Sequence, residues 1–336
     1  MNEEMHMKAK DQSRKRSFLR VSLAATLTVA TAAIGQTWPS RTVRVVAPFT
    51  PGGTVDLMAR LLAEKLPAAI GTSAGFVVEN RPGAAGNVGT DYVAKQPADG
   101  YTLLVHGSVA ASAVFGQVLP YDPFKDFAPI SQLAVTILVL ATSANVPATN
   151  LNELIAYARA NPGKLTYASV GAGTPQHFAS ELLRQIAKID IVHVPYKGGA
   201  QVVAALLAGD VGFSVNGANT VTPHAGGGKL RMIAVPMPTR SAYIPNVPTI
   251  AESLPAYDLP TSWLGLYAPA GTPRPIIDRL NQEANRIVTD PQIAKDRLFT
   301  IGLEPIGTTP EKHMEVIRSD LAKYVRIAKD GNIRPD

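Results

Sequence analysis

The sequence predicts an α/β protein that folds into two lobes, each a mixed β-sheet flanked by helices. Apolar, β-branched runs alternate along the chain with segments of helical periodicity, which is typical of layered α/β sheets. Two apolar, extended segments, 130–142 and 262–268, interrupt this alternation, and we expect them to cross from one lobe to the other. The chain has 336 residues, 46% of them hydrophobic, which suffices for one large or two medium domains.

The first set of elements begins with a strand at 42–47 and a helix at 54–70. The helix is predicted from one apolar face, formed by Met58, Leu61, Leu62, Leu66 and Ala69. A strand at 76–79, a glycine-rich stretch at 83–89, a helix at 90–96 and a strand at 101–106 follow. Because strands and helices alternate here, we expect a largely parallel sheet.

The second set comprises a helix at 151–160, a strand at 165–170, a helix at 175–187, a strand at 191–194, a helix at 200–207 and a strand at 211–215. We expect terminal helices at 273–288 and 311–327 to complete the first lobe. The first lobe is therefore predicted to comprise residues 36–139 and 263–336, and the second lobe residues 140–262. Two lobes joined by two crossover strands form a cleft that closes by hinge motion.

The N-terminus predicts export. A basic stretch at 14–20 precedes a mildly apolar run at 21–34, which is shorter than the roughly 20 residues of a membrane-spanning helix. We therefore expect residues 1–35 to be a signal peptide and the mature protein to lie in the periplasm. The Sec route is favoured over the twin-arginine route because Lys15 stands where the first arginine of that signal belongs. An uncleaved amphipathic helix is the alternative.

Composition and motifs argue against several classes of protein. The chain has no cysteine, so disulfides and thiolate sites are excluded, and its lysines and arginines form no basic block of the kind that binds nucleic acid. Nucleophile-elbow, phosphate-loop and dinucleotide-binding patterns are all incomplete, and the histidines lack metal-ligand spacing. We expect no catalytic residues, no metal and no cofactor.

Two short stretches, 48–56 and 169–177, are built alike. Each follows an apolar run and turns through glycines onto a threonine, Thr54 or Thr174, that we expect to cap a helix. Backbone N–H groups and the positive end of the helix dipole then point at one spot, which favours an anion. The pair predicts a site that holds a carboxylate, although either loop alone could be an ordinary capped turn.

Several side chains near these loops have two interpretations. Asp56 could receive a ligand ammonium, a hydroxyl or a bridging water, or it could only support the start of its helix. His177 could donate to a carboxylate when protonated, or be a wall residue whose hydrogen bonds are satisfied. Trp263 and Tyr267 could line a cleft or pack a hinge.

The chain resembles the Bug-type (tripartite tricarboxylate transporter) family of periplasmic solute-binding proteins. The resemblance runs in order over almost the whole mature chain and includes PFTPGGTVD (48–56), VVENRPGAAGNVG (77–89), PGKLTYASVGAGTPQH (162–177), HVPYKGGAQ (193–201) and APAGTPRPIIDRLNQE (268–283). It implies a two-lobed periplasmic binding protein type II fold, with a carboxylate ligand held by the two loops. The ligand-binding residues expected on this basis are Phe49, Pro51, Gly52, Gly53, Thr54, Asp56, Ser108, Ser169, Gly171, Gly173, Thr174, His177 and Asn216.

Two departures from the family pattern bear on the ligand. Asn216 stands where the family often has an aspartate, and the segment 106–111 is smaller and more apolar than usual. Because a cleft with fewer polar partners penalises a polar ligand tail, we expect a ligand with an apolar or aromatic body.

The predicted function is that of an extracytoplasmic receptor for a small organic carboxylate. The resemblance implies that it delivers this ligand to the membrane subunits of a tripartite tricarboxylate-type secondary transporter, and we expect a monomer. Two alternatives stay open: an enzyme that hydrolyses or modifies a carboxylate ester or amide, and a sensing module for a signalling partner. Amino acids, di- and tricarboxylates and aromatic acids all fit such a site.

Overall fold

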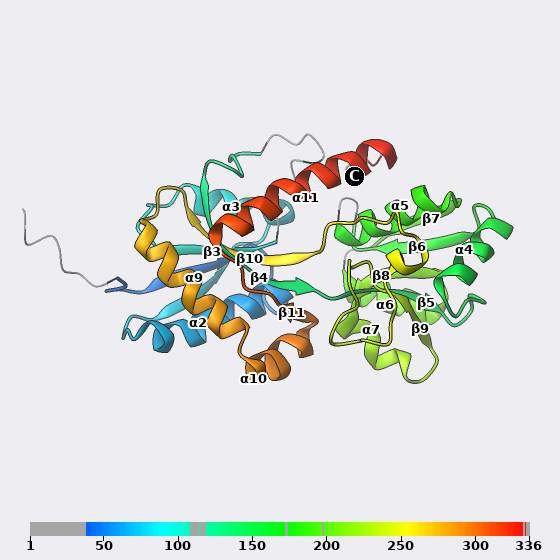
Figure 1. Ribbon diagram of the computed structural model, residues 1–336, viewed down its shortest axis with the longest axis horizontal. Coiled ribbons are helices and arrows are strands. Elements are labelled where there is room, and N and C mark those ends of the chain that lie inside the picture. The colour runs from blue at the N-terminus through cyan, green and yellow to red at the C-terminus, as the bar shows by residue number, and fades with distance from the viewer. Residues whose placement is uncertain are drawn as a thin grey trace, which may run out of the picture. The chain divides into compact units, whose positions relative to one another are not determined.

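The structure is a computed structural model that describes residues 38–107, 114, 119–171, 174–196, 198–331 and 333. The predicted signal peptide, residues 1–35, lies outside the described residues. Residues 41–336 form a unit distinct from residues 1–40, and all the helices and strands described below belong to it (Figure 1).

The first sheet has six strands in the order β11-β4-β10-β3-β1-β2. Their bounds are β1 (Val43–Ala47), β2 (Phe76–Asn80), β3 (Thr102–His106), β4 (Phe127–Thr136), β10 (Trp263–Pro269) and β11 (Leu303–Pro305). Strands β2, β1 and β3 are parallel, whereas β10 runs antiparallel to both β3 and β4, and β11 runs antiparallel to β4. The sheet is therefore mixed, and its parallel half carries the first predicted loop.

The second sheet has five strands in the order β7-β6-β8-β5-β9. Their bounds are β5 (Leu138–Ser143), β6 (Leu165–Ser169), β7 (Ile191–Pro195), β8 (Phe213–Gly217) and β9 (Leu230–Ala234). Strands β7, β6 and β8 are parallel, and β5 runs antiparallel to β8 and β9. The prediction of two mixed sheets flanked by helices is confirmed.

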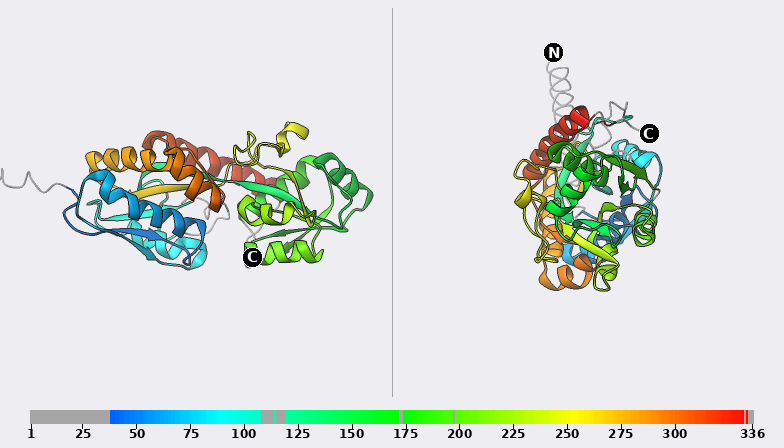
Figure 2. Two further views of the ribbon diagram at one scale, coloured as in Figure 1. Left: turned by 90° about the horizontal axis from the view of Figure 1, so that it is seen from below. Right: turned by 90° about the vertical axis from the view of Figure 1, so that its right-hand side faces the viewer.

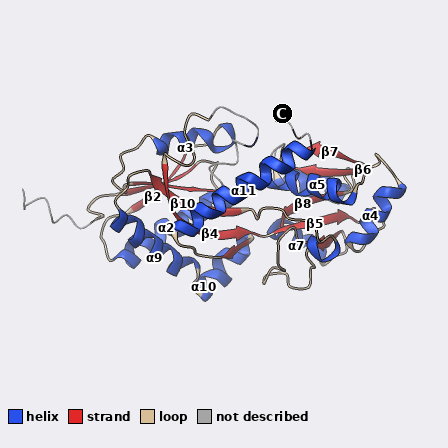
Figure 3. Cartoon of the chain, turned by 45° about the horizontal axis from the view of Figure 1, so that its top comes forward, coloured by secondary structure: helices blue, strands red, loops and turns tan. Residues whose placement is uncertain are grey.

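Helices lie on both sides of the strands (Figures 2 and 3). The helices are α2 (Thr54–Ile70), α3 (Asn87–Ala94), α4 (Leu151–Ala160), α5 (Pro175–Ala187), α6 (Gly199–Ala208), α7 (Ala218–Ala225), α8 (Ile250–Ser253), α9 (Arg274–Val288), α10 (Pro291–Ile293) and α11 (Pro310–Gly331), with short turns η1 (Ala84–Gly86), η3 (Ala294–Leu298) and η4 (Phe299–Ile301). Within the described ranges, no helix combines the length and the apolar character needed to cross a bilayer.

The apolar segment predicted to cross between the lobes is two strands. β4 belongs to the first sheet, β5 to the second, and Ile137 is the single residue between them. The Ile137 N–H donates to the carbonyl of Gly302, next to β11, and its carbonyl accepts from the N–H of Ala218 at the start of α7, both at 2.8 Å. Ile137 is therefore fixed to a residue adjoining a strand of each sheet, β11 in the first and β8 in the second.

The residues of β5 face two apolar cores in alternation. Leu138 and Leu140 pack in the core that contains Tyr167, whereas Val139 and Ala141 pack in the core on the other face. Successive side chains of a strand point to opposite faces, so a sheet covered on both sides needs apolar residues at every position. This explains why the segment reads as one continuous apolar run.

The last helix, α11, joins both halves of the fold. Ile317, in its first half, packs in the core with Trp263 and Tyr267 of β10. Tyr324 and Ile327, in its second half, belong to the core under the second sheet. We expected this helix to complete the first lobe; only its first half packs there. The buried positions of Trp263 and Tyr267 also place them in a packed strand.

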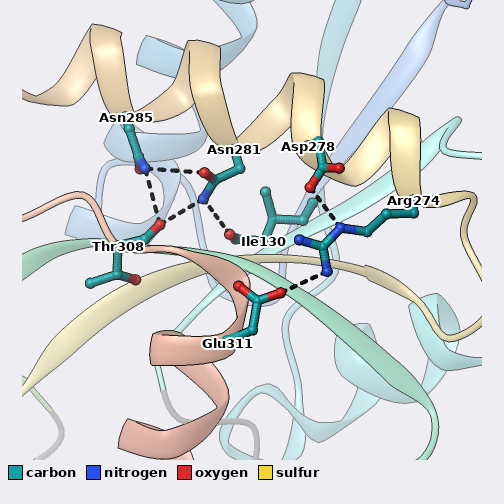
Figure 4. A network of polar contacts seen from close by, with 7 residues as sticks. All are labelled: Ile130, Arg274, Asp278, Asn281, Asn285, Thr308 and Glu311. Atoms are coloured by element: carbon teal, nitrogen blue, oxygen red, sulfur yellow. Dashed lines mark hydrogen bonds and ion pairs between the residues drawn. The ribbon is translucent and has the colours of Figure 1, made fainter.

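A polar network holds α9 against the first sheet (Figure 4). Asn281 Nδ2 donates to the carbonyls of Ile130 and Thr308, at 2.7 and 2.6 Å, and Asn285 Nδ2 donates to the same Thr308 carbonyl at 3.0 Å. Arg274 contacts both Asp278 and Glu311 (Figure 4). These bonds fix the segment that leads into α11.

Replacing Asp320 on α11 by asparagine should change how stability depends on pH. Trp263 Nε1 donates to Asp320 Oδ2 at 2.7 Å, and burial raises the pKa of this carboxyl from 3.8 to about 6. Between these values the folded protein holds a proton that the unfolded chain has released, so this group's contribution to stability falls as pH rises. Asp320→Asn keeps a hydrogen-bond acceptor for Trp263, and because asparagine does not titrate, the stability lost by the wild type as pH rises is not lost by the variant.

The measurement is the free energy of unfolding by urea between pH 4 and pH 7.5. The advantage of the variant over the wild type should grow as pH rises from 4 to 6 and then level off, at up to about 3 kcal/mol. Asp278→Asn, at an exposed acid of α9, is the control. A constant difference across this pH range would contradict the assignment.

Candidate ligand-binding site

The first predicted loop joins the end of β1 to α2. The N-cap residue is Gly53, with extended backbone angles (φ −77°, ψ 166°) and no side-chain cap, so Thr54 is already helical and the cap role predicted for it is wrong. The first helical bond runs from the Leu57 N–H to the Gly53 carbonyl at 2.9 Å. In the described part of the chain, the N–H groups of Gly53, Thr54 and Val55 meet no hydrogen-bond acceptor, so they are available to an anion.

The loop is fixed from inside by Asp56, which is 1% exposed. Its carboxylate accepts from the Gly52 N–H at 2.9 Å, from Arg60 Nε at 2.8 Å and from Asn80 Nδ2 at 2.9 Å. Burial opposes ionisation, but the hydrogen bonds from Arg60, Gly52 and Asn80 outweigh it, and the pKa of Asp56 is lowered. Of the two interpretations of Asp56, this geometry favours support of the loop, because the carboxylate already has three donors in the protein.

The second predicted loop joins the end of β6 to α5. Thr174 is the N-cap and Pro175 is the first helical residue, as predicted; Thr174 Oγ1 accepts from the His177 N–H at 3.4 Å. The same hydroxyl donates to the Gly171 carbonyl at 2.8 Å, and the Gly171 N–H donates to Ser169 Oγ at 3.1 Å. Gly171 has φ +119°, which favours glycine in this turn.

These contacts change which groups are available to a ligand. The N–H groups of Gly52 and Gly171 are already bonded to Asp56 and Ser169, so these two glycines shape the turns instead of donating. Pro175 has no N–H. Among the described residues, the helix-start N–H groups that meet no acceptor include those of Gly53, Thr54 and Val55 on α2, and that of Gln176 on α5.

His177 lies in a stack of rings beside the second loop. Its side chain is buried, and its ring is 4.1 Å from that of His193, at an interplanar angle of 10°. The His193 ring stacks in turn on Tyr167, 4.9 Å away, and its Nε2 lies 2.6 Å from Ser169 Oγ. His193 is not among the site residues predicted from the sequence. Its place on the strand next to β6 could have indicated it.

Asn216 lies at the end of β8, next to β6 in the sheet. It is 4% exposed; its Oδ1 accepts from the Gly217 N–H at 2.9 Å, and its Nδ2 donates to the Gly199 carbonyl at 3.2 Å. Asn216 thus ties β8 to the start of α6. Of the other predicted site residues, Ser108 and Gly173 lie outside the described residues.

The aromatic part of the first loop packs on a neighbouring strand. The Phe49 ring lies 5.4 Å from the ring of His106, at the end of β3, and Pro51 is exposed. Burial lowers the pKa of His106 to about 4, so its imidazole is neutral at pH 7. A neutral ring beside a phenyl ring suits an apolar part of a ligand better than a second anionic group.

The two loops occupy equivalent places in their sheets. β1 is flanked by the parallel strands β2 and β3, and β6 by the parallel strands β7 and β8. Parallel strands bring their carboxyl ends to one edge, which is where ligands bind in open α/β sheets. In the described part of the chain, no cluster of three histidine or acidic side chains could hold a metal ion.

The sequence profile of the tripartite tricarboxylate transporter family receptor (TctC) matches residues 58–333. The chain belongs to this family. It is therefore a member of a family of solute-binding receptors and not of enzymes, as the sequence predicted.

Curated relatives align over nearly the whole chain. A UPF0065 protein in the tcbD–tcbE intergenic region of Pseudomonas sp. is 35% identical over 94% of this chain and 93% of its own length. Protein BugT of Bordetella pertussis is 33% identical over 91% of this chain and 94% of its own length.

Solved structures of similar proteins have the same fold. R. palustris Rpa4515 with adipate has a TM-score of 0.77 and 34% identity, covering 89% of this chain and 100% of that chain. MatC from Rhodopseudomonas palustris with bound malate has a TM-score of 0.71 and 28% identity, covering 86% and 99%. Periplasmic binding protein BugD has a TM-score of 0.72 and 28% identity, covering 89% and 100%.

Proposed function

We propose that this protein is a periplasmic receptor that binds a small organic dicarboxylate and delivers it to the membrane subunits of a tripartite tricarboxylate transporter. The observation that carries this proposal is the start of α2, where Gly53 leaves three consecutive backbone N–H groups without an acceptor in the described residues. A carboxylate satisfies such a helix start, and the dipole of a 17-residue helix supports it.

The dicarboxylate class rests on two further considerations. Two helix starts, one at the end of the strand next to the edge strand in each sheet, suit a ligand with an anionic group at each end. Relatives whose structures contain adipate and malate bind acids of this kind. Phe49 and the neutral His106 favour an aliphatic chain between the carboxylates, so adipate is the first ligand to test.

The test is Gly53→Asp. Gly53 has φ −77°, an angle that any residue adopts, and a Cβ at this position would come no closer than 3.9 Å to the Thr50 carbonyl. The aspartate side chain therefore fits without strain. An aspartate at an N-cap bonds to the helix N–H groups and stabilises the helix, by a few tenths of a kcal/mol relative to glycine, and its charge interacts favourably with the helix dipole. Its carboxylate then occupies the donors that the ligand needs. The unliganded protein should melt at a higher temperature while the thermal shift caused by adipate disappears.

Gly53→Ala is the matched control, since it leaves the N–H groups open. It should bind adipate within about threefold of the wild type and melt slightly lower, because alanine caps a helix less well than glycine. For the wild type, a ligand at about 100 times its Kd adds about 2.7 kcal/mol to the free energy of unfolding. If Gly53→Asp bound adipate as the wild type does, α2 would not be part of the ligand site.

A further inference from the structure

The first loop is held by a side chain from the neighbouring strand. Asn80, the last residue of β2, pairs in register with Ala47 of β1. Its Nδ2 group donates to the Phe49 carbonyl at 3.1 Å and to Asp56 Oδ1 at 2.9 Å. The other oxygen of Asp56 accepts the Gly52 N–H. Asn80 therefore fixes both the loop backbone at Phe49 and the Asp56 carboxylate, which accepts the hydrogen bond from the Gly52 N–H.

The second loop has a corresponding arrangement. His193 lies on β7 and pairs in register with Tyr167 of β6. Its Nε2 is 2.6 Å from Ser169 Oγ, and Ser169 Oγ accepts the Gly171 N–H. The hydroxyl has one proton to donate, so it can bond to the imidazole or to the Gly171 carbonyl, which lies 3.1 Å away. In either case His193 fixes the Ser169 side chain, which accepts the hydrogen bond from the Gly171 N–H.

The two arrangements share one plan although their residues differ. In each sheet the strand outside the loop-bearing strand is parallel to it and lies at the edge of the sheet. In each sheet, a polar side chain of the edge strand forms a hydrogen bond with an acceptor side chain: Asn80 with Asp56, and His193 with Ser169. That acceptor receives the hydrogen bond from the backbone N–H of a glycine with positive φ, Gly52 or Gly171. Neither Asn80 nor His193 was among the residues that sequence reasoning placed in the site.

We propose that Asn80 and His193 are positioning residues that set the conformation of the two ligand-binding loops, each acting through its own acceptor side chain. The assignment of the loops to the ligand rests on the function proposed above. A turn whose glycine N–H is fixed presents its remaining donors in one orientation, so the entropy of ordering the loop is not lost on binding. The N–H groups of α2 and α5 then meet a carboxylate without rearrangement.

Amide hydrogen exchange tests the proposal without any ligand. We would compare the exchange rates of the Gly52 and Gly171 N–H groups by NMR in the wild type, Asn80→Asp and His193→Phe. Aspartate keeps the shape of Asn80 but has no N–H donors, and phenylalanine keeps the stacked ring of His193 but cannot bond to Ser169. Each variant should speed exchange about fivefold at the glycine of its own loop and leave the other glycine unchanged, because one hydrogen bond contributes about 1 kcal/mol.

A conservative variant separates positioning from packing. His193→Gln offers an amide that can bond to Ser169 Oγ but removes the ring from the stack with His177 and Tyr167. Under the proposal it restores slow exchange at Gly171 even if the melting temperature falls. If the ring stack alone mattered, His193→Gln would speed exchange at Gly171 and His193→Phe would not, which would overturn the proposal.

Binding of adipate, measured by calorimetry, is the second readout. Asn80→Asp and His193→Phe should each weaken binding about tenfold, and His193→Gln should recover most of it. Should Asn80→Asp fail to fold, because two carboxylates then meet, Asn80→Ala removes the donors without the repulsion. If adipate does not bind the wild type, the proposed ligand is wrong, and the exchange rates still decide the proposal. Equal changes at both glycines in either variant would overturn it.

Discussion

Replacing Asp56 by alanine is expected to destabilise the protein by about 2–4 kcal/mol and to abolish ligand binding. The substitution removes the acceptor of the Gly52 N–H and of one Asn80 N–H, and both groups then lie unpaired in a partly buried site. It also frees the first loop, so the N–H groups at the start of α2 lose their fixed orientation. The free energy of unfolding by urea and the affinity for adipate, each measured at pH 7, check the two parts.

The pH dependence follows from the direction of the shift. Because the pKa of Asp56 is lowered in the folded protein, its contribution to stability is present above the unfolded value of 3.8 and is lost as pH falls through the folded value. The difference between wild type and Asp56→Ala should therefore shrink in strongly acidic solution.

Arg60→Ala is the matched control. The Arg60 side chain is 52% exposed, so removing it deletes one bond to Asp56 and leaves the bonds from Gly52 and Asn80 in place. Because solvent screens such an exposed ion pair, its effect on the free energy of unfolding should be much smaller than that of Asp56→Ala. If Asp56→Ala bound the ligand as tightly as Arg60→Ala, the loop would not depend on this carboxylate.

The fold could be predicted from local patterns because its parallel units combine apolar strands with amphipathic helices. The helix at 54–70 and the strand at 76–79 were expected from periodicity and from turn residues, and the structure has them there within one residue. β11 has only three residues, and its pairing with β4 joins segments more than 160 residues apart. Such a pairing leaves no periodic signal in the sequence.

The packing of the second half of α11 could not be predicted from the sequence, for a different reason. Its apolar face was visible in the sequence, but Tyr324 and Ile327 pack on a core formed by residues far earlier in the chain. Periodicity shows that a helix has a face to bury, not which sheet receives it. The position of a helix that spans two cores therefore depends on tertiary contacts.

The candidate site could be predicted as two loops but not as a set of donors. Glycines followed by threonine indicated helix starts at 54 and 175, and the structure has both. Which N–H groups remain available depends on Asp56 and Ser169, which fold back onto the glycines. The bonds from Asn80 and His193 join neighbouring strands, and the register that brings them together is not encoded locally.

Gly265→Ala is expected to be among the most destabilising single-methyl substitutions in the first sheet. A Cβ at Gly265 would lie 2.4 Å from Cε1 and 2.6 Å from Nε2 of His313, and 3.1 Å from Cζ3 of Trp263. His313 is fully buried, with its ring 5.1 Å from that of Trp263 and 4.8 Å from that of Tyr267, so it has nowhere to move. Overpacking of this kind costs about 1–3 kcal/mol, and here it also separates α11 from β10.

A double-mutant cycle tests this explanation. His313→Ala alone leaves a cavity and should cost about 2–4 kcal/mol. In Gly265→Ala/His313→Ala the added methyl enters that cavity, so the double variant should be at least about 1 kcal/mol more stable than the sum of the single effects predicts. Strict additivity in urea unfolding at pH 7 would mean that the strain at Gly265 arises from the backbone and not from His313.

The same variants carry a pH signature. Burial lowers the pKa of His313 from 6.5 to about 3. Below pH 6.5 the unfolded chain therefore takes up a proton that the folded protein excludes. As pH falls, this difference lowers the free energy of unfolding. His313→Ala removes that dependence, whereas Gly265→Ala keeps it. The neutral imidazole of His313 has no hydrogen-bond partner among the described residues. It packs α11 against β10, and α11 continues into the second core. A pH-independent difference between wild type and His313→Ala would show that the imidazole titrates normally and that this helix contact is open to water.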